Sequence, residues 1–428
     1  MRDARGLEVS GADAGCVAAL DRFLADFLAF QDAAANILEF ARSEPGCLAA
    51  QLYAVGLLCY SQSDTTIATE AAPFLARGQA LAAQATERER LLLAAVAAWS
   101  RSDFAAGIAA LEVLIATAPT DIVAVKFAEF LFFQAPDFPR HLGFMRRAAT
   151  GCADLPEFGA QLAFAHELNR EFGTAIDVAE AAIAAQPDNP WAHHALAHAY
   201  LSQGALEQGL AVLPHHAPGW ARHGRGIRAH NAWHLALLHL GRREAAPVHA
   251  LYHGEIFGFD PLSPFEHTDT ISLLWRLELA GLPTGADWQP LAEVAAMRAA
   301  DAVFPFLAAH YVYALGRAGA VPEGEAAIAA LQRRHGDAGA WRVGSALLPG
   351  VLALAQGDAA RAAERLEPAM PSIGSVGGSD AQNDLFRQSF LVALIESGRA
   401  AEARTELRRR LEGVQPTPLD EYWLSRAA

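Results

Sequence analysis

The chain has 428 residues, of which 53% are hydrophobic and 19% charged, and its formal net charge is −15. This length exceeds what a single hydrophobic core normally serves, so we expect several domains or an array of repeats. The negative charge argues against binding to nucleic acid or to an anionic membrane surface, because both depend on Lys and Arg. The sequence has no run of about 18 apolar residues, so we expect no membrane span.

Neither the N-terminus nor the cysteines indicate export. The opening stretch, MRDARGLEVSGADAGC, lacks the basic-then-apolar order of a signal peptide. The four cysteines (Cys16, Cys47, Cys59 and Cys152) show no CxxC spacing. We therefore expect neither a thiolate zinc site nor a disulfide scaffold, and we predict a cytoplasmic protein.

The chain contains an internal repeat of helical segments. Alanine is abundant and β-branched runs are few, which favours helices. Two similar segment ends, LIATAPTD and AIAAQPDN, place Pro119 and Pro187 68 residues apart. That distance is twice the 34-residue tetratricopeptide period. The sequence therefore predicts an all-α fold, a tetratricopeptide-like solenoid of antiparallel helix pairs.

The domain organisation follows from where this repeat is regular. We predict an N-terminal helical region at 1–86, helical repeats carrying paired histidines at 87–253, and C-terminal helical repeats at 254–428. Gly and Pro gather at 254–266 and Gly and Ser at 370–384, and both stretches are predicted loops. The run Arg408–Arg410 is interpreted as a solvated helix face.

Histidines concentrate in the middle of the chain. Thirteen of the sixteen lie between His166 and His267. Two HxxxH pairs stand out, His194 with His198 and His230 with His234, and each pair occupies one helical face. The two pairs are 36 residues apart, close to one repeat. We therefore expect them on equivalent helices of adjacent repeats, with four imidazoles converging on one concave patch.

Three interpretations of these histidines remain open. The rings could bind a divalent transition metal, for which imidazole is a common ligand, although no glutamate completes an HExxH motif. They could act as acid, base or hydrogen-bond partners for a small organic ligand. They could also be buried structural residues bonded to one another, to carbonyls or to water. Asp269 could orient one imidazole, or it could cap its own helix.

Several strings resemble the tetratricopeptide repeat protein 38 family. These are PWAHHALAHAYLSQG, HNAWHLALLHL, DTISLLWRLELAG and GGSDAQNDLFRQSF, and the resemblance extends over most of the chain. It implies an all-helical repeat fold and supplies no activity. The polar positions that match the family are His194, His198, His230, Asn231, Trp233, His234, Asp269, Arg276 and His310.

The chain departs from that family at three positions. Ala308 replaces a commonly acidic residue, and Asp380 and Asn383 stand in a loop motif that usually reads Gly-Gly-Ser-His-Ala-Gln-Arg-Asp. If the family site includes these positions, the resemblance implies a remodelled site with a different ligand or reaction.

Two functions compete. One is a closed pocket, rich in His and Trp, that binds a small molecule and supports metal-assisted catalysis; the other is a non-catalytic scaffold that holds a peptide or protein partner. The clustered histidines and tryptophans favour the pocket, and whether it is an enzyme stays open. We assign catalytic roles to His198, His234 and Asp269, and metal binding to the four paired histidines. The predicted ligand-binding residues are His194, His230, Asn231, Trp233, Trp275, Arg276, His310 and Asp380.

Overall fold

A computed structural model describes residues 1–258 and 263–428 of the chain. Almost all of its regular structure is helical, and the described residues form no β-strand beyond one isolated bridge between Arg2 and Glu8. The predicted all-α class is therefore confirmed. Among the described residues, no helix is both long and apolar enough to cross a bilayer.

The chain divides into two compact units. The first contains residues 1–196 and 219–227, and the second contains residues 197–218 and 228–428. The division falls within α12 (Pro190–Gln203), near the end of α13 (Leu206–Trp220) and within α14 (Arg225–Gly241), so these three helices contribute to both units. The three-part organisation expected from the sequence stays a prediction.

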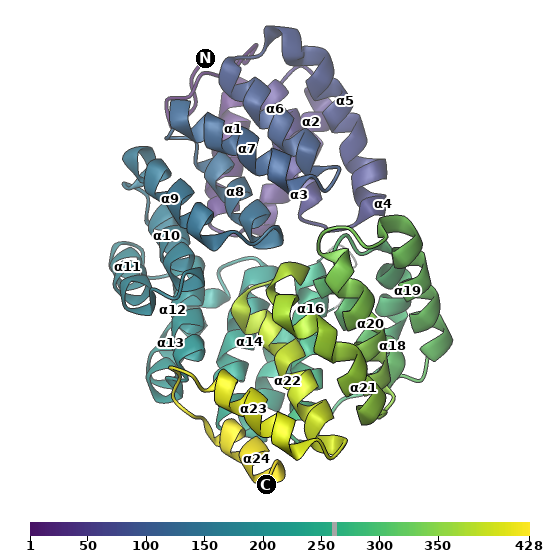
Figure 1. Cartoon of the computed structure of the whole chain (residues 1–428). Coiled ribbons are helices and arrows are strands. Elements are labelled where there is room, and N and C mark those ends of the chain that lie inside the picture. The colour runs from purple at the N-terminus through teal and green to yellow at the C-terminus, as the bar shows by residue number, and fades with distance from the viewer. Residues whose placement is uncertain (259–262) are drawn as a thin grey trace. The chain divides into compact units, whose positions relative to one another are not determined.

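The first unit is built from short antiparallel helices (Figure 1). Their bounds are α1 (Ala14–Leu28), α2 (Asn36–Ser43), α3 (Leu48–Cys59), α4 (Asp64–Thr66), α5 (Ala72–Leu81), α6 (Glu87–Trp99), α7 (Phe104–Thr117), α8 (Ile122–Gln134), α9 (Phe138–Cys152), α10 (Pro156–Leu168) and α11 (Phe172–Ala185). Consecutive helices such as α6 with α7 and α10 with α11 pack as pairs. The buried centre of the contact between α10, α11 and α12 consists of Ala160, Ala182 and Ala192, small residues that let the helices approach closely.

The second unit continues the same pattern. Its helices are α15 (Ala245–Leu251), α16 (Pro264–Leu279), α17 (Gln289–Arg298), α18 (Pro305–Arg317), α19 (Val321–His335), α20 (Trp341–Ala355), α21 (Ala359–Leu366), α22 (Asp380–Glu396), α23 (Ala400–Arg410) and α24 (Pro418–Arg426). Helix α16 packs against both α18 and α22. It therefore lies inside this unit, and nearly all of its residues are buried.

A positive-φ glycine forms the turn between α12 and α13. Gly204 has φ +69°, which favours glycine, and a Cβ atom added there would lie 2.3 Å from the carbonyl oxygen of Gln415. The neighbouring Gln203 carbonyl accepts a hydrogen bond from the Gln415 amide at 3.1 Å. The turn that follows the first histidine helix is thus closed by the segment between α23 and α24.

The second predicted loop is mostly ordered into helix. Residues 367–376 form η6 (Glu367–Val376), two short 3₁₀ segments that meet at a kink at Ser372, and α22 begins at Asp380. A capping box begins α22, because Ser379 and Gln382 satisfy each other's backbone N–H groups. Of the other predicted loop, residues 259–262 lie outside the described residues; it is flanked by the π-helix η4 (Tyr252–Ile256) and by α16.

One disulfide lies in the first unit, and the cysteine spacing did not predict it. Cys16 on α1 is bonded to Cys47, which directly precedes α3, whereas Cys59 and Cys152 are free and buried. The bond cross-links the N-terminal helix to the third helix across a separation of 31 residues.

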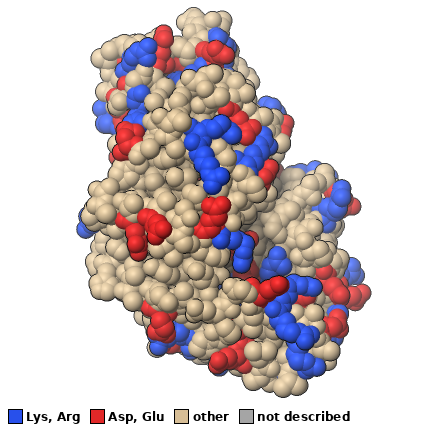
Figure 2. Space-filling view, turned by 60° about the vertical axis from the view of Figure 1, so that its left-hand side comes forward, with Lys and Arg blue, Asp and Glu red and all other residues tan. Residues whose placement is uncertain are grey.

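Charged side chains occur in small mixed groups on the face shown in Figure 2, with blue and red atoms beside one another. The run Arg408–Arg410 is only partly the solvated face that we expected. Arg408 and Arg409 are exposed, but Arg410 pairs with Asp384 and with Asp420 at 2.8 Å. Arg410 differs because its side chain points toward α22 and α24, the helices that carry Asp384 and Asp420.

Candidate metal centre

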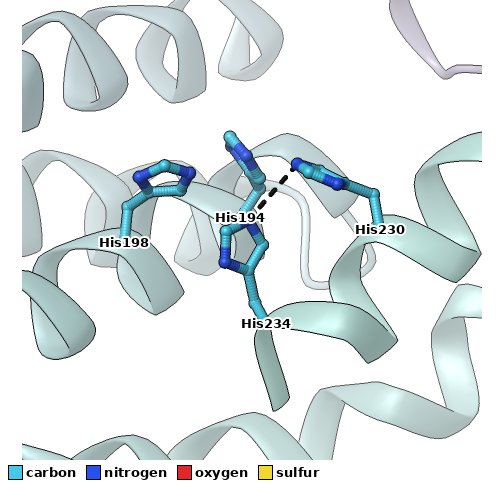
Figure 3. A group of neighbouring side chains, drawn as sticks. All are labelled: His194, His198, His230 and His234. Carbon is cyan, nitrogen blue, oxygen red and sulfur yellow. Dashed lines mark hydrogen bonds between the residues drawn. The ribbon is translucent and has the colours of Figure 1, made fainter. Parts of the chain in front are cut away.

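Four histidines from two helices lie together. His194 and His198 occupy successive turns of α12, and His230 and His234 occupy successive turns of α14. All four are buried, and one ring nitrogen from each lies within 4.8 Å of the others. Figure 3 shows the four rings turned toward one another. The convergence expected from the 36-residue spacing is therefore present, with His194 one turn before His198 on the same continuous helix.

One pair has the spacing of two ligands on one ion. The Nε2 atoms of His230 and His234 are 3.3 Å apart. Two nitrogens bound tetrahedrally to zinc at about 2.0–2.1 Å are separated by about 3.3 Å. The ring centroids of His198 and His234 lie 4.5 Å apart. These three histidines all belong to the second unit.

Asp269 orients one of these rings. Its Oδ2 lies 2.9 Å from Nδ1 of His230, and both side chains are buried. A carboxylate can only accept this bond, so Nδ1 of His230 donates it, and Nε2 is the ring nitrogen that faces His234. Asp269 lies inside α16, whose N-cap residue is Ser263, so the alternative interpretation of Asp269 as an N-cap is wrong. A carboxylate behind a histidine is the arrangement that commonly supports a metal ligand.

Trp233 forms a wall beside the same two rings. Its ring is fully buried and parallel to that of His230, with centroids 5.4 Å apart, and it meets His234 edge-on at 4.8 Å. Its Nε1 donates to the hydroxyl of Ser272 at 2.9 Å. Asp269 and Ser272 lie one turn apart on α16, so that one face of this helix holds both His230 and Trp233 in place.

His194 has its own support in the first unit. Trp191 stacks on it with ring centroids 4.1 Å apart, and the indole N–H of Trp191 donates to Glu129 at 2.8 Å. The other oxygen of Glu129 accepts from the buried ammonium of Lys126 at 2.7 Å, and that ammonium lies 4.1 Å above the Trp191 ring. Sequence reasoning missed Lys126 and Glu129, because nothing in VKFAEFLFF separates an ion pair from an ordinary apolar helix.

Three further predicted residues form a second buried group, around α16, α18 and α22. Arg276 donates from Nη2 to the carbonyl oxygens of Ala381 and Gln382, at 2.8 and 3.3 Å. Its guanidinium lies 5.2 Å from the Trp233 ring, and burial lowers the pKa of Arg276 to about 10. Trp275 stacks on Tyr313 at 3.8 Å and lies 6.1 Å from His310.

His310 is a neutral ring at physiological pH. Burial lowers its pKa to about 3, although a hydrogen bond to the backbone of Phe306 acts in the opposite direction. The Phe306 carbonyl can only accept, so Nδ1 donates to it, over 2.8 Å. His310 therefore cannot serve as a cation, and it lies with Arg276 and Trp275 rather than in the four-histidine cluster.

The remaining predicted residues differ in burial. Asn231 is buried on α14 beside His230, whereas Asp380 is exposed at the first position of α22. Asp380 is therefore the predicted ligand-binding residue with the most solvent contact. Asn383, one turn further along α22, is buried and donates to the Gly378 carbonyl at 3.2 Å. The roles assigned to all these residues stay predictions.

Comparison with known families places the first histidine pair within a recognised repeat. Residues 168–223 match the tetratricopeptide repeat family. The matched segment contains α11, α12 and α13, and hence His194 and His198. The match shows tetratricopeptide repeat structure for this segment of the chain. Antiparallel helix pairs continue beyond the matched segment. That these pairs are tetratricopeptide repeats, and the narrower resemblance to the tetratricopeptide repeat protein 38 family, stay predictions.

Among solved structures, the chain is similar to a tetratricopeptide repeat protein from Parabacteroides merdae, with 12% identity, a TM-score of 0.28, and coverage of 71% of this chain and 98% of that one. It is also similar to the P58(IPK) TPR domain, with 10% identity, a TM-score of 0.24, and coverage of 80% and 97%. The all-α assignment rests on the helices described above rather than on these similarities.

Proposed function

We propose that this tetratricopeptide-like protein binds a divalent transition-metal ion through the paired histidines of α12 and α14. His198, His230 and His234 form the core of the site, and His194 is the fourth ligand. The observation that carries the proposal is the grouping of four buried imidazole nitrogens within 4.8 Å, one of them backed by a carboxylate. Buried histidines with a purely structural role need neither four grouped rings nor a carboxylate bonded to one of them.

The donor set fits such an ion. Neutral imidazoles suit Zn²⁺, Co²⁺, Ni²⁺ and Cu²⁺, and the carboxylate of Asp269 adds negative charge one bond beyond His230. The spacing of His230 and His234 matches a tetrahedral edge, whereas the group as a whole spreads over up to 4.8 Å. A bound ion would therefore draw the outer rings inward.

The proposed role of the ion is to bind and polarise a small molecule. His198, His230 and His234 would hold the ion, and a small molecule could take the position of His194, where the ion would supply Lewis acidity. The residues of this chain do the rest: Asp269 keeps the proton of His230 on Nδ1, and Trp233 excludes water from one side of the rings.

Metal content of the purified protein tests the proposal. After exposure to Zn²⁺, Co²⁺, Ni²⁺ or Cu²⁺ and removal of free ions, we expect about one equivalent of one of them by mass spectrometry. His198→Ala and His234→Ala should lose it while circular dichroism stays unchanged. His239→Ala is the matched control, because His239 lies on the same helix but pairs with Glu244 at 2.7 Å. An unmodified chain that retains none of these ions, or equal loss from the control, would refute the proposal.

A second candidate function is that of an interaction scaffold. The match of residues 168–223 to the tetratricopeptide repeat favours it, since such repeats present surfaces for peptides or proteins. In that case the four rings are structural, and the hydrogen-bonded pair His230–His234 is sufficient explanation for them. This function would be supported if the unmodified chain binds no metal and the His198→Ala and His234→Ala variants are less stable than it.

A further inference from the structure

Arg276 is a buried cation without an anionic partner in contact with it. Its side chain is 2% exposed, and within the described residues no carboxylate lies within 4 Å of its guanidinium. Two backbone carbonyls of α22 accept from Nη2, but Nη1 has no hydrogen-bond partner in the described part of the chain. Buried polar groups are almost always satisfied, so an orphaned N–H of a charged group needs an explanation.

The carboxylate with the largest electrostatic effect on Arg276 is engaged elsewhere. Asp384 stabilises the charge of Arg276 at a distance, yet it accepts hydrogen bonds from Arg410 and, at 2.7 Å, from Gln388. Arg410 is itself shared with Asp420. Neither acid can therefore turn to Arg276 without breaking an existing ion pair. A missing acceptor at Nη1 has to come from outside this set.

Two more orphaned polar atoms lie on the same pair of packed helices. The indole N–H of Trp275, adjacent to Arg276 on α16, has no partner among the described residues, and neither does Oδ1 of Asn383 on α22. Asn383 directly follows the two residues whose carbonyls accept from Arg276. The group therefore offers two donors and one acceptor, all buried.

The surroundings are aromatic. Trp233 lies 5.2 Å from the guanidinium, and Phe386 on α22 lies 6.0 Å from the rings of both Trp275 and His310. Aromatic side chains of this kind suit a ligand with an apolar group rather than a hydrated ion. The nearby negative charges of Asp384 and Asp269 favour a monoanion over a phosphate dianion.

We infer that Arg276 binds the carboxylate of a small aromatic or aliphatic 2-hydroxy or 2-amino acid. The carboxylate accepts from Nη1 of Arg276 and from the indole N–H of Trp275. The adjacent hydroxyl or ammonium donates to Oδ1 of Asn383. This site is made from residues of the second unit alone, and it needs no metal.

Calorimetric titration of the full chain with four probes tests the inference. Mandelate carries the carboxylate, the hydroxyl and an apolar body; phenylacetate lacks the hydroxyl; mandelamide lacks the charge; inorganic phosphate is the hydrated anion. We expect mandelate to bind most tightly and mandelamide about 10- to 100-fold more weakly, because a charge-assisted hydrogen bond is lost. Phosphate should not compete.

Variants separate this site from general effects. Arg276→Gln should weaken mandelate by about 10- to 100-fold, and Asn383→Leu should remove the preference for mandelate over phenylacetate. The matched control is Arg317→Gln, which removes an arginine of the same unit that pairs with Glu278 at 2.8 Å. If Arg276→Gln does not fold, the probe series on the unmodified chain and Asn383→Leu decide.

The inference is overturned if the unmodified chain binds none of the carboxylates, or binds mandelate and mandelamide equally. The titration is repeated on chelator-treated protein and on His234→Ala. We expect the same mandelate affinity in both samples. That result shows that mandelate binds without the metal centre, so one proposal can fail while the other holds.

Discussion

At His230 a single contact determines what the ring can do. Asp269 fixes the proton on Nδ1 across 2.9 Å, and Nε2 then lies 3.3 Å from His234. From the sequence, Asp269 could either orient an imidazole or cap its own helix. In the structure it is bonded to His230 and lies inside the helix. This residue therefore offers the most specific test of the metal centre.

Asp269→Asn should weaken metal binding by about 10- to 100-fold, because the amide supports the imidazole less strongly and supplies no charge. Competition against a chromophoric zinc chelator measures the affinity. Asp287→Asn is the control, because Asp287 is exposed and accepts only from the nearby Gln289 backbone. Equal affinities in Asp269→Asn and the unmodified chain would show that this carboxylate has no such role.

The pH dependence of stability should reveal two neutral histidines. Burial lowers the pKa of both His141 and His310 to about 3, whereas an unfolded histidine titrates at about 6.5. Below that pH the unfolded chain takes up protons that the folded chain refuses, so the free energy of unfolding falls as pH drops from about 6.5 toward about 3. Each residue contributes about 1.4 kcal/mol per pH unit. Urea unfolding of His310→Gln between about pH 6 and about pH 4 should show a slope smaller by that amount, and an identical slope would contradict the prediction.

The sequence was sufficient to predict part of the candidate site, but not all of it. The two HxxxH pairs and their 36-residue spacing were sufficient to predict that four rings would meet. The partners of Arg276 lie more than 100 residues away on α22, and Lys126 and Glu129 resemble ordinary positions in an apolar helix. Contacts of this kind depend on how distant helices pack, which a periodic pattern does not specify.

At the scale of helices, the site depends on the packing of α14 along α16. His230 with Asp269, and Trp233 with Ser272, are two successive contacts between the same helix faces. The repeat pattern predicted the helices themselves. It did not predict that residues 370–384 would be largely helical, because the Ser379–Gln382 capping box begins α22 inside a stretch rich in Gly and Ser.

The turn after α12 should be unusually sensitive to a methyl group. Gly204→Ala combines a left-handed backbone with a contact of 2.3 Å to the Gln415 carbonyl, whereas Gly398→Ala has φ +78° but open space around the new atom. We expect a loss of about 1–2 kcal/mol for Gly398→Ala and about 1–3 kcal/mol more for Gly204→Ala. Urea unfolding midpoints compare the two, and equal losses would mean that the Gln415 segment yields without cost.

At the scale of the chain, two compact units share the helices that carry the histidines. His198, His230 and His234 belong to the second unit, so a bound ion should stabilise that unit most. At a free metal concentration 100 times the dissociation constant, we expect a gain of about 2.7 kcal/mol. Thermal unfolding with and without Zn²⁺ measures it, and a gain that persists in the His198→Ala, His234→Ala double variant would point to binding elsewhere.

Helix α24 affects how ligand-binding measurements on this protein should be designed. Trp423 of α24 is fully buried, and its indole N–H donates to the carbonyl of Leu279 at 3.0 Å, at the end of the helix that carries Asp269 and Arg276. Deleting α24 would uncover that carbonyl and the apolar surface around it. Leu279 lies three residues beyond Arg276 on α16, so ligand measurements on this helix should be made with α24 in place.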